Sequence, residues 1–158
     1  MAGSHTHNDQ IKIDHAHIGI VASQFNAAIV DSLLDACVTT LLNGGITQDD
    51  LTVVRVPGAF EIPVVAQRLL LTEDYDAVIG LGAVIRGDTP HFEYICRECA
   101  RGLATLSIKH DRPVIFGVLT VDNLKQAEDR SGPIETNKGA EAAQAAIETI
   151  LALREIKS

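Results

Sequence analysis

The sequence predicts a single α/β domain in which helices cover both faces of a four-stranded parallel sheet, a three-layer doubly wound architecture. Three observations lead to this prediction. Apolar runs of strand length alternate along the chain with segments of helical periodicity, the pattern of β-α units. The apolar runs are continuous, as expected for parallel strands buried on both faces. The length of 158 residues suits one domain with a substantial core.

The chain begins its regular structure with a strand and a helix. The segment HIGIVAS at 17–23 is predicted as a strand. Residues 26–45 are predicted as a helix, because apolar side chains recur every fourth position from Ile29 to Leu41. Two consecutive glycines at 44–45 provide the C-terminal stop.

Two further strand–helix pairs follow. DLTVVRVP at 50–57 is predicted as a strand, and residues 59–73 as mostly helix. Pro63 is compatible with that helix only in its first turn. YDAVIGLGAVI at 75–85 is the most apolar strand, and residues 90–110 form the next predicted helix.

The last strand is expected at 113–121, followed by a short helix at 123–131 and a long one at 137–158 with an alanine-rich face. We expect residues 13–158 to form the single domain and residues 1–12 a flexible tail. His5 and His7 in the tail could bind a metal ion, but a flexible tail is the favoured interpretation.

Composition and charge exclude several classes of function. The net charge of −8 argues against nucleic acid and anionic membranes as main partners, since both reward basic surfaces. No apolar run reaches the roughly 18–20 residues that span a bilayer. The N-terminus has no signal-peptide pattern, so the three cysteines are expected to be reduced thiols in a cytoplasmic protein. Cys96 and Cys99 form a C-x-x-C, but it lies inside a predicted helix rather than at its start, which disfavours a redox or metal site.

Ligands of doubly wound sheets bind beyond the carboxyl ends of the strands, so the segments there are the candidate site. Phe25, Phe60 and Phe92 each fall just past a strand, and Phe116 lies within the fourth strand. Scarce aromatic residues in equivalent places favour stacking on a flat heterocycle over packing of helix ends onto the sheet. Glu61 is either an acceptor for ligand hydroxyls or a carboxylate favoured by a helix N-terminus.

The segment GDTPHFEY at 87–94 opens the third long helix. Thr89 suits the N-cap and Pro90 the first helical position, which leaves free N–H groups that favour an anion such as phosphate. Asp88 opposes a phosphate unless its side chain turns away, and Arg86 could offset it. His91 is a candidate base or an ordinary surface histidine. The helix dipole disfavours its imidazolium form and a bound phosphate favours it, so the residues leave its charge open.

Several common sites are unsupported. The chain has no G-x-G-x-x-G after its first strand, no Walker A motif, no G-x-S-x-G and no H-E-x-x-H. No cluster of cysteine, histidine and carboxylate residues has metal-binding spacing. Arg130 and Lys138 flank the loop SGPIETN, where cations are mostly solvated surface. From the residues alone, the chain is expected to bind a flat ligand, with a phosphate as a further option.

These segments resemble those of the 6,7-dimethyl-8-ribityllumazine synthase family of riboflavin biosynthesis. The resemblance runs in order through IVASQFN (20–26), VRVPGAFEIP (54–63), GAVIRGDTPHFEY (82–94), FGVLT (116–120), QAEDR (126–130) and NKGAEAA (137–143). It implies a flavodoxin-like version of the predicted fold. It also implies a cytoplasmic transferase without metal or organic cofactor, which condenses 5-amino-6-(D-ribitylamino)uracil with 3,4-dihydroxy-2-butanone 4-phosphate and releases phosphate and water.

The resemblance also implies roles for individual residues. It implies that the ribitylaminouracil is bound by Phe25, Ala59, Phe60, Glu61, Ala83, Val84, Ile85, Phe116 and Lys138. It implies that the butanone phosphate is bound by Asp88, Thr89 and Arg130, and that His91 is the proton-transfer residue. The family's site is shared between subunits, so Phe116, Arg130 and Lys138 would reach in from a neighbour.

The implied assembly is a homopentamer with active sites between adjacent subunits. The family leaves open a shell of sixty subunits and association with riboflavin synthase. The loop GPIETNKG (132–139) keeps the N-K-G of the shell-forming G-T-K-x-G-N-K-G pattern but not its lysine or inner glycine. One alternative is therefore a self-assembling shell or scaffold derived from the family. Another is a flavodoxin-type flavin-binding module, but SQFNAA replaces the expected Ser/Thr/Gly-rich loop after the first strand.

Overall fold

A computed structural model describes residues 11–72 and 74–156. Its four strands form one sheet in the order β2-β1-β3-β4, and all neighbours are parallel. The strands are β1 (Ile18–Ser23), β2 (Leu51–Val56), β3 (Ala77–Ile85) and β4 (Val114–Val121). The four-stranded parallel sheet that the apolar runs predicted is therefore confirmed.

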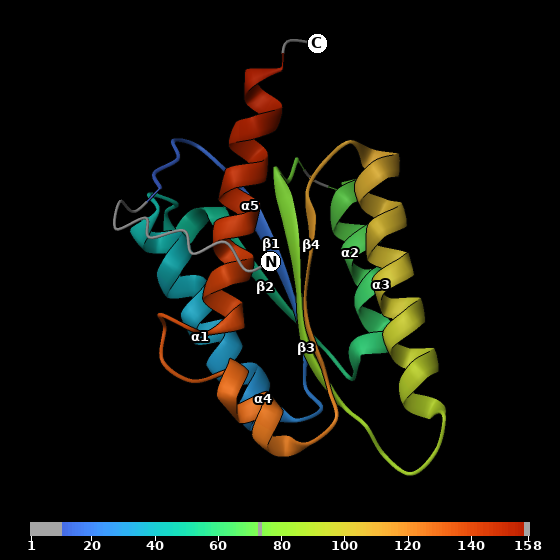
Figure 1. Cartoon of the computed structure of the whole chain (residues 1–158). Coiled ribbons are helices and arrows are strands. Elements are labelled where there is room, and N and C mark those ends of the chain that lie inside the picture. Colours follow the sequence, from blue (N-terminus) through green and yellow to red (C-terminus); the bar gives the residue numbers. More distant parts are fainter. Residues whose placement is uncertain (1–10, 73, 157–158) are drawn as a thin grey trace.

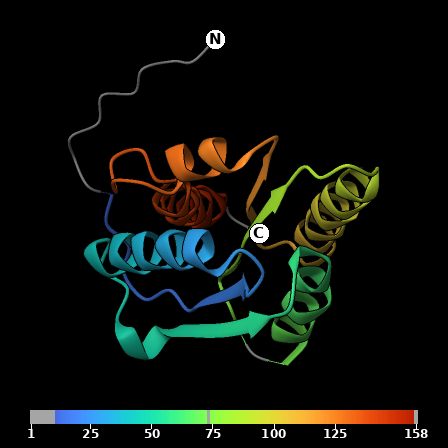
Figure 2. The same ribbon diagram turned by 90° about the horizontal axis from the view of Figure 1, so that it is seen from below.

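The helices lie on both faces of this sheet, as expected for a doubly wound fold. They are α1 (Ala27–Asn43), α2 (Ile62–Thr72), α3 (His91–His110), α4 (Leu124–Arg130) and α5 (Lys138–Glu155), with 3₁₀ turns η1 (Gln48–Asp50) and η2 (Ala59–Glu61). Figures 1 and 2 show α1, α4 and α5 on one face and α2 and α3 on the other. The three-layer, flavodoxin-like architecture is confirmed.

Each helical layer has its own hydrophobic core. One core joins β1 and β3 to α1 and α5, and its fully buried members include Ile18, Ile20, Leu33 and Leu41. The other joins the sheet to α2 and α3 and includes Val21, Ile62, Val78 and Leu103. Ile20 and Val21 are successive residues of β1 that point to opposite cores, which explains why this strand is apolar throughout.

The predicted boundaries hold to within a few residues, with two corrections at the helix starts. The helix predicted at 59–73 begins as the 3₁₀ turn η2, and Pro63 is the second residue of α2, in the first turn as its chemistry requires. The third helix starts at His91, with Pro90 rather than Thr89 at the N-cap. Thr89 still acts locally, because its hydroxyl accepts a hydrogen bond of 3.4 Å from the His91 N–H.

The expectation of a flexible tail at 1–12 falls mostly outside the described residues, as do His5 and His7. The last two residues of that segment are described. Ile11 packs against the core, and the Lys12 ammonium donates to the Asn43 carbonyl over 2.6 Å.

The start of α5 is fixed against α1 by its first residues. Asn137, which is 3% exposed, accepts a hydrogen bond from the Gly139 N–H at 2.7 Å and so caps the helix. Its amide also donates to the carbonyls of Ser32 at 3.3 Å and Gly132 at 3.0 Å. These three bonds hold Lys138, one of the expected site residues, at a defined place beside the edge strand β4.

Candidate functional site

A pocket of about 570 Å³ lies beyond the carboxyl ends of β1, β2 and β3, where the sequence predicted a ligand site. Its volume falls within the usual range for small-molecule sites. Nine residues expected at the site line it, namely Phe25, Ala59, Phe60, Glu61, Ala83, Val84, Ile85, Thr89 and His91. They come from four separate segments, which the parallel sheet brings to one edge. Figure 2 views the molecule from this side.

The turn between β1 and α1 presents Phe25 to this pocket. Its N–H donates to the Pro57 carbonyl at 3.0 Å, and the preceding Gln24 N–H donates to the Val56 carbonyl at 2.7 Å. Asn26 then adopts a left-handed conformation with φ of 60°, and its side-chain amide donates to the Ala83 carbonyl at 2.8 Å. The turn is thus tied to both β2 and β3 while the Phe25 ring remains 71% exposed and free to stack.

Sequence reasoning did not single out Asn26. The one signal available was its residue type, because asparagine adopts left-handed backbone more readily than other non-glycine residues. Its partner, the Ala83 carbonyl, is far away along the chain, so no local pattern identifies the bond.

The connection from β2 to α2 supplies a second aromatic ring and a carboxylate. Gly58 is extended, and its carbonyl accepts from the Glu61 N–H at 3.2 Å to close the turn η2. Ala59 is buried while Phe60 is 58% exposed, so this turn packs through the small side chain and leaves the ring at the pocket. Glu61, partly exposed, adds a hydrogen-bond acceptor beside it.

The connection from β3 to α3 brings His91 to the same pocket. Gly87, Thr89 and His91 line it, whereas Asp88 is exposed and is not among the lining residues. The His91 N–H donates to the Thr89 hydroxyl and the Glu93 N–H to the Pro90 carbonyl, and the dipole of the helix still favours an anion at this end of the pocket.

Phe92 behaves differently from the other two phenylalanines that follow strands. It is 9% exposed, and the guanidinium of Arg86 lies 4.4 Å above its ring centroid. Phe92 also lines the pocket, but its covered ring offers little surface for stacking, so the expectation of three stacking rings fits Phe92 least well. Phe25 and Phe60 remain as the exposed rings of this pocket.

Arg86 does not act as the partner of Asp88 that the sequence suggested. Its Nε lies 2.9 Å from Asp122 and a terminal nitrogen lies 2.5 Å from Glu93. The hydrogen bond from Arg86 lowers the pKa of the Glu93 carboxyl below its ordinary value, and Asp122 and Glu93 together raise the pKa of Arg86.

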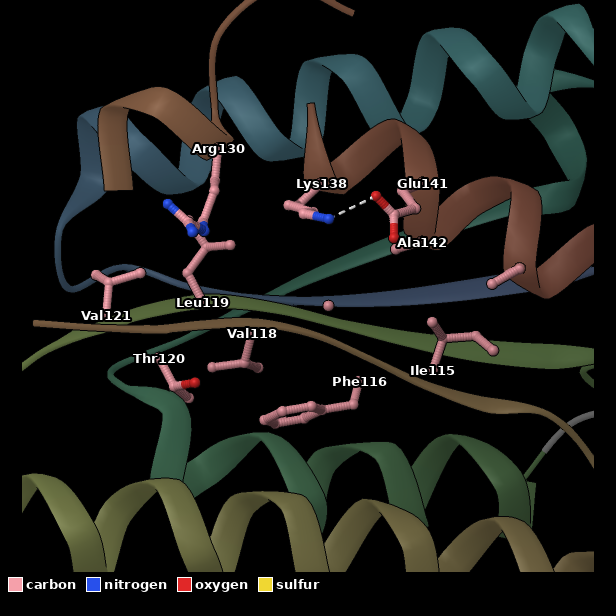
Figure 3. A pocket seen from close by; sticks show the side chains of 12 residues that line it. Ile115, Phe116, Val118, Leu119, Thr120, Val121, Arg130, Lys138, Glu141 and Ala142 are labelled. Carbon is pink, nitrogen blue, oxygen red and sulfur yellow. Dashed lines mark hydrogen bonds and ion pairs between the residues drawn. The ribbon is translucent and has the colours of Figure 1, made fainter. Parts of the chain in front are cut away.

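A second pocket, of about 300 Å³, lies along the edge strand β4 and contains three of the four remaining expected residues, Phe116, Arg130 and Lys138, whereas Asp88 lines neither pocket (Figure 3). The Lys138 ammonium lies 2.8 Å from Glu141, and Arg130 donates to the Gln126 carbonyl at 3.0 Å. Figure 3 shows the two cations on one side of β4 and the Phe116 ring on the other. Within one chain, these three residues do not join the nine of the first pocket.

The cysteine environments disfavour redox chemistry at the C-x-x-C. Burial raises the pKa of the Cys37 and Cys99 thiols to about 12, and burial also raises the pKa of Cys96. A reactive C-x-x-C needs a lowered thiol pKa instead. Among the residues that the structure describes, no group of three or more histidine, cysteine and carboxylate side chains could hold a metal ion.

These thiols give a direct test of the packing. We expect iodoacetamide at about pH 8 to label Cys96 first, because burial leaves Cys37 and Cys99 with roughly a thousandfold less thiolate than a free thiol. Peptide mass spectrometry over time measures this, with urea-unfolded protein as the control in which all three react alike. The thiols of the unfolded chain lose their protons at a lower pH than the buried thiols of the folded protein. The free energy of unfolding should therefore fall as the pH rises above about 9. Rapid labelling of Cys37 in the folded protein would contradict the buried core.

No helix in the described part of the chain is both long enough and apolar enough to cross a membrane. The family model described as 6,7-dimethyl-8-ribityllumazine synthase matches residues 15–154. The match extends from just before β1 into the last turn of α5 and includes every residue of both pockets.

Proposed function

The chain belongs to the 6,7-dimethyl-8-ribityllumazine synthase family of riboflavin biosynthesis, and on that premise we propose that it is a transferase that makes 6,7-dimethyl-8-ribityllumazine. The proposed substrates are 5-amino-6-(D-ribitylamino)uracil and 3,4-dihydroxy-2-butanone 4-phosphate, and phosphate and water are released. The observation that carries this proposal is the convergence of nine site residues from four segments on one pocket of suitable volume.

The pocket supplies the groups that a ribityl-substituted uracil requires. The exposed ring of Phe25 offers a stacking surface for the heterocycle. The ends of η2 and β3 offer Ala59, Phe60, Ala83, Val84 and Ile85 as walls and backbone partners. Glu61 is the proposed acceptor for ribityl hydroxyls, because a carboxylate forms stronger hydrogen bonds than a neutral acceptor.

The phosphorylated substrate is proposed to bind at the start of α3. The main-chain N–H groups of Asp88 and Thr89 and the positive end of the α3 dipole would hold its phosphate, with Arg130 as the cation. His91 would then lie beside the carbon chain of the butanone, in position to move protons between the reacting groups.

Each chemical step has a defined proton and leaving group. The 5-amino group of the uracil attacks the ketone and loses water to give a Schiff base. Loss of the proton at C3 of the butanone expels phosphate from C4 and leaves an enol, which tautomerises to a ketone. The ribitylamino nitrogen attacks this ketone, and loss of a second water closes the ring. Holding two polyfunctional substrates in register is worth about 7–11 kcal/mol of the barrier, so positioning is the largest contribution expected here.

The complete site is proposed to form between two subunits of a homopentamer in the cytoplasm. Support comes from Phe116, Arg130 and Lys138, which lie along the edge strand β4 in a pocket that shares no residue with the first. The edge pocket of one subunit would face the first pocket of its neighbour. Native mass measurement distinguishes a pentamer from a shell or scaffold, for which the altered loop at 132–139 is the relevant segment.

The direct test mixes the purified protein with both substrates and follows the lumazine chromophore by absorbance. A rate well above the uncatalysed background is expected. A rate equal to the background would refute the proposal.

In that assay, Arg130→Ala should impair use of the phosphorylated substrate. We expect KM for the butanone phosphate to rise about tenfold or more, since a charge-assisted contact to phosphate is removed. KM for the ribitylaminouracil should change little. Lys125→Ala on the same helix α4 is the matched control, because Lys125 pairs with Asp129 one turn away and does not line either pocket. Equal changes in both KM values would contradict the assignment of Arg130 to the phosphate.

A further inference from the structure

The loop that leads into α3 is the least supported segment of the proposed site. Every residue from Gly87 to His91 is exposed, and a side chain added at Gly87 would meet nothing within 4 Å. In the described part of the chain, the hydrogen bonds of this segment are local: the His91 N–H donates to the Thr89 hydroxyl at 3.4 Å, and the Glu93 N–H donates to the Pro90 carbonyl at 3.1 Å. These bonds do not connect the loop to the rest of the fold.

Arg86 makes that connection. Its N–H donates to the Val121 carbonyl at 2.9 Å, which continues the β3–β4 pairing by one residue. Its guanidinium then bridges two carboxylates far apart in the sequence, Asp122 at the end of β4 and Glu93 in the first turn of α3. Arg86, just before the loop, is thereby connected to Glu93, just after it, and to the end of β4. The carboxyl ends of β3 and β4 lie together at this point (Figure 1).

The guanidinium also packs on Phe92, at 4.4 Å from the ring centroid. Phe92 and Glu93 are the two residues that follow His91, so Arg86 contacts the helix directly behind the histidine. The planar fork of arginine suits this task, since it can donate to two carboxylates and stack on a ring at the same time. A lysine ammonium is a point charge and cannot reproduce that geometry.

We propose that Arg86 is a positioning residue that holds the 87–90 loop and His91 in the geometry needed for the phosphorylated substrate, through Glu93, Asp122 and Phe92. This inference rests on the proposed function. Exposed ion pairs add little to global stability, and Arg86, Glu93 and Asp122 are all at least two-fifths exposed. The effect of Arg86 is therefore local to the loop.

The test is Arg86→Ala in the lumazine-forming assay. We expect KM for the butanone phosphate to rise and kcat to fall, with kcat/KM for that substrate reduced about tenfold to a hundredfold. KM for the ribitylaminouracil should stay within about twofold, because Phe25 and Glu61 belong to other segments. Arg86→Lys should recover only part of the loss. Glu93→Gln should lower activity in the wild-type protein but have no further effect in the Arg86→Ala background.

Arg112→Ala is the matched control, because Arg112 also pairs with a carboxylate, Asp74 at 3.9 Å, but lies before the amino end of β4, at the other end of the strands from the loop. It should leave both KM values and kcat unchanged. Unchanged kinetics in Arg86→Ala, or equal loss with both substrates, would overturn the proposal.

A second readout separates this inference from the proposed function. Amide hydrogen exchange of the full protein, measured by mass spectrometry without substrates, should become about tenfold faster in the first turn of α3 in Arg86→Ala and stay unchanged in β1 and β3. If the wild-type protein makes no lumazine, the proposed function fails while this measurement still decides whether Arg86 holds the loop. Unchanged exchange would show that it does not.

Discussion

Replacing Gly139 with alanine is expected to lower the free energy of unfolding by about 3 kcal/mol or more. Gly139 lies in the first turn of α5, where that helix crosses α1. A Cβ at this position would lie 2.0 Å from the Leu33 carbonyl oxygen, 2.6 Å from its carbonyl carbon and 2.8 Å from its Cα. All three atoms are backbone, so no side-chain rotation can relieve the overlap.

The two helices would have to move apart to accommodate the methyl group. Their contact is one of the tightest in the molecule, with Ala143, Ala146 and Ile147 of α5 buried in the same core as Leu33 and Cys37 of α1. Close-packed interiors transmit such a displacement rather than absorbing it. Alanine is the better helix former by about 1 kcal/mol, which offsets only part of the loss.

Thermal and urea unfolding measure this effect. A loss of about 3 kcal/mol corresponds to a fall in Tm of roughly 6–12 °C for a chain of this size. Gly132→Ala is the control, because a Cβ there meets nothing closer than the Glu128 carbonyl oxygen at 3.6 Å, an ordinary contact. The control should change stability by less than about 1 kcal/mol. Similar stability of the two variants would contradict the close approach of α5 to α1.

The same crossing of α5 and α1 fixes the position of Lys138 in the edge pocket. In the segment Asn137-Lys138-Gly139, the asparagine caps α5 and bonds to α1, and the glycine allows the close approach. Lys138 stands between them and faces Glu141 and the pocket. Two structural residues thus fix the direction of one charged side chain, so Gly139→Ala should also disturb the pocket that contains Arg130.

The sequence predicted the elements well because their signals are local. Continuous apolar runs identified the four strands, and the rule for parallel sheets identified the edge where Phe25, Phe60 and His91 meet. Neither inference requires knowledge of which side chains touch across the sheet. The roles of the individual site residues came from the family resemblance, and they stay predictions.

The contacts that support the site could not be predicted in the same way. Arg86 pairs with Asp122, and Asn26 bonds to Ala83, across separations of 36 and 57 residues. No periodicity connects such partners. Phe92 shows the converse error: it follows a strand as Phe25 does and lines the same pocket, yet its ring is 9% exposed and covered by Arg86. Only the three-dimensional packing distinguishes it from the two open rings.

His91→Ala is expected to lower kcat by about 10²–10⁴-fold without abolishing the reaction. The histidine is exposed at the first residue of α3 and lines the same pocket as Phe25 and Glu61, so it can reach substrates that other residues hold. Binding in register does not depend on the imidazole. The variant should therefore retain a rate above the uncatalysed background, because positioning of the two substrates still lowers the activation barrier.

The pH dependence distinguishes proton transfer from a purely steric role of His91. If the imidazole moves protons, kcat should depend on pH in the wild type, and the variant should lose that dependence along with its rate. His110→Ala is the matched control, because His110 ends the same helix α3, far from the pocket, and should keep the wild-type profile. A His91→Ala rate equal to the wild type at every pH measured would exclude the proton-transfer role. A lower rate with an unchanged pH profile would assign His91 to binding, and the proton would then have to move through water or through the substrates themselves.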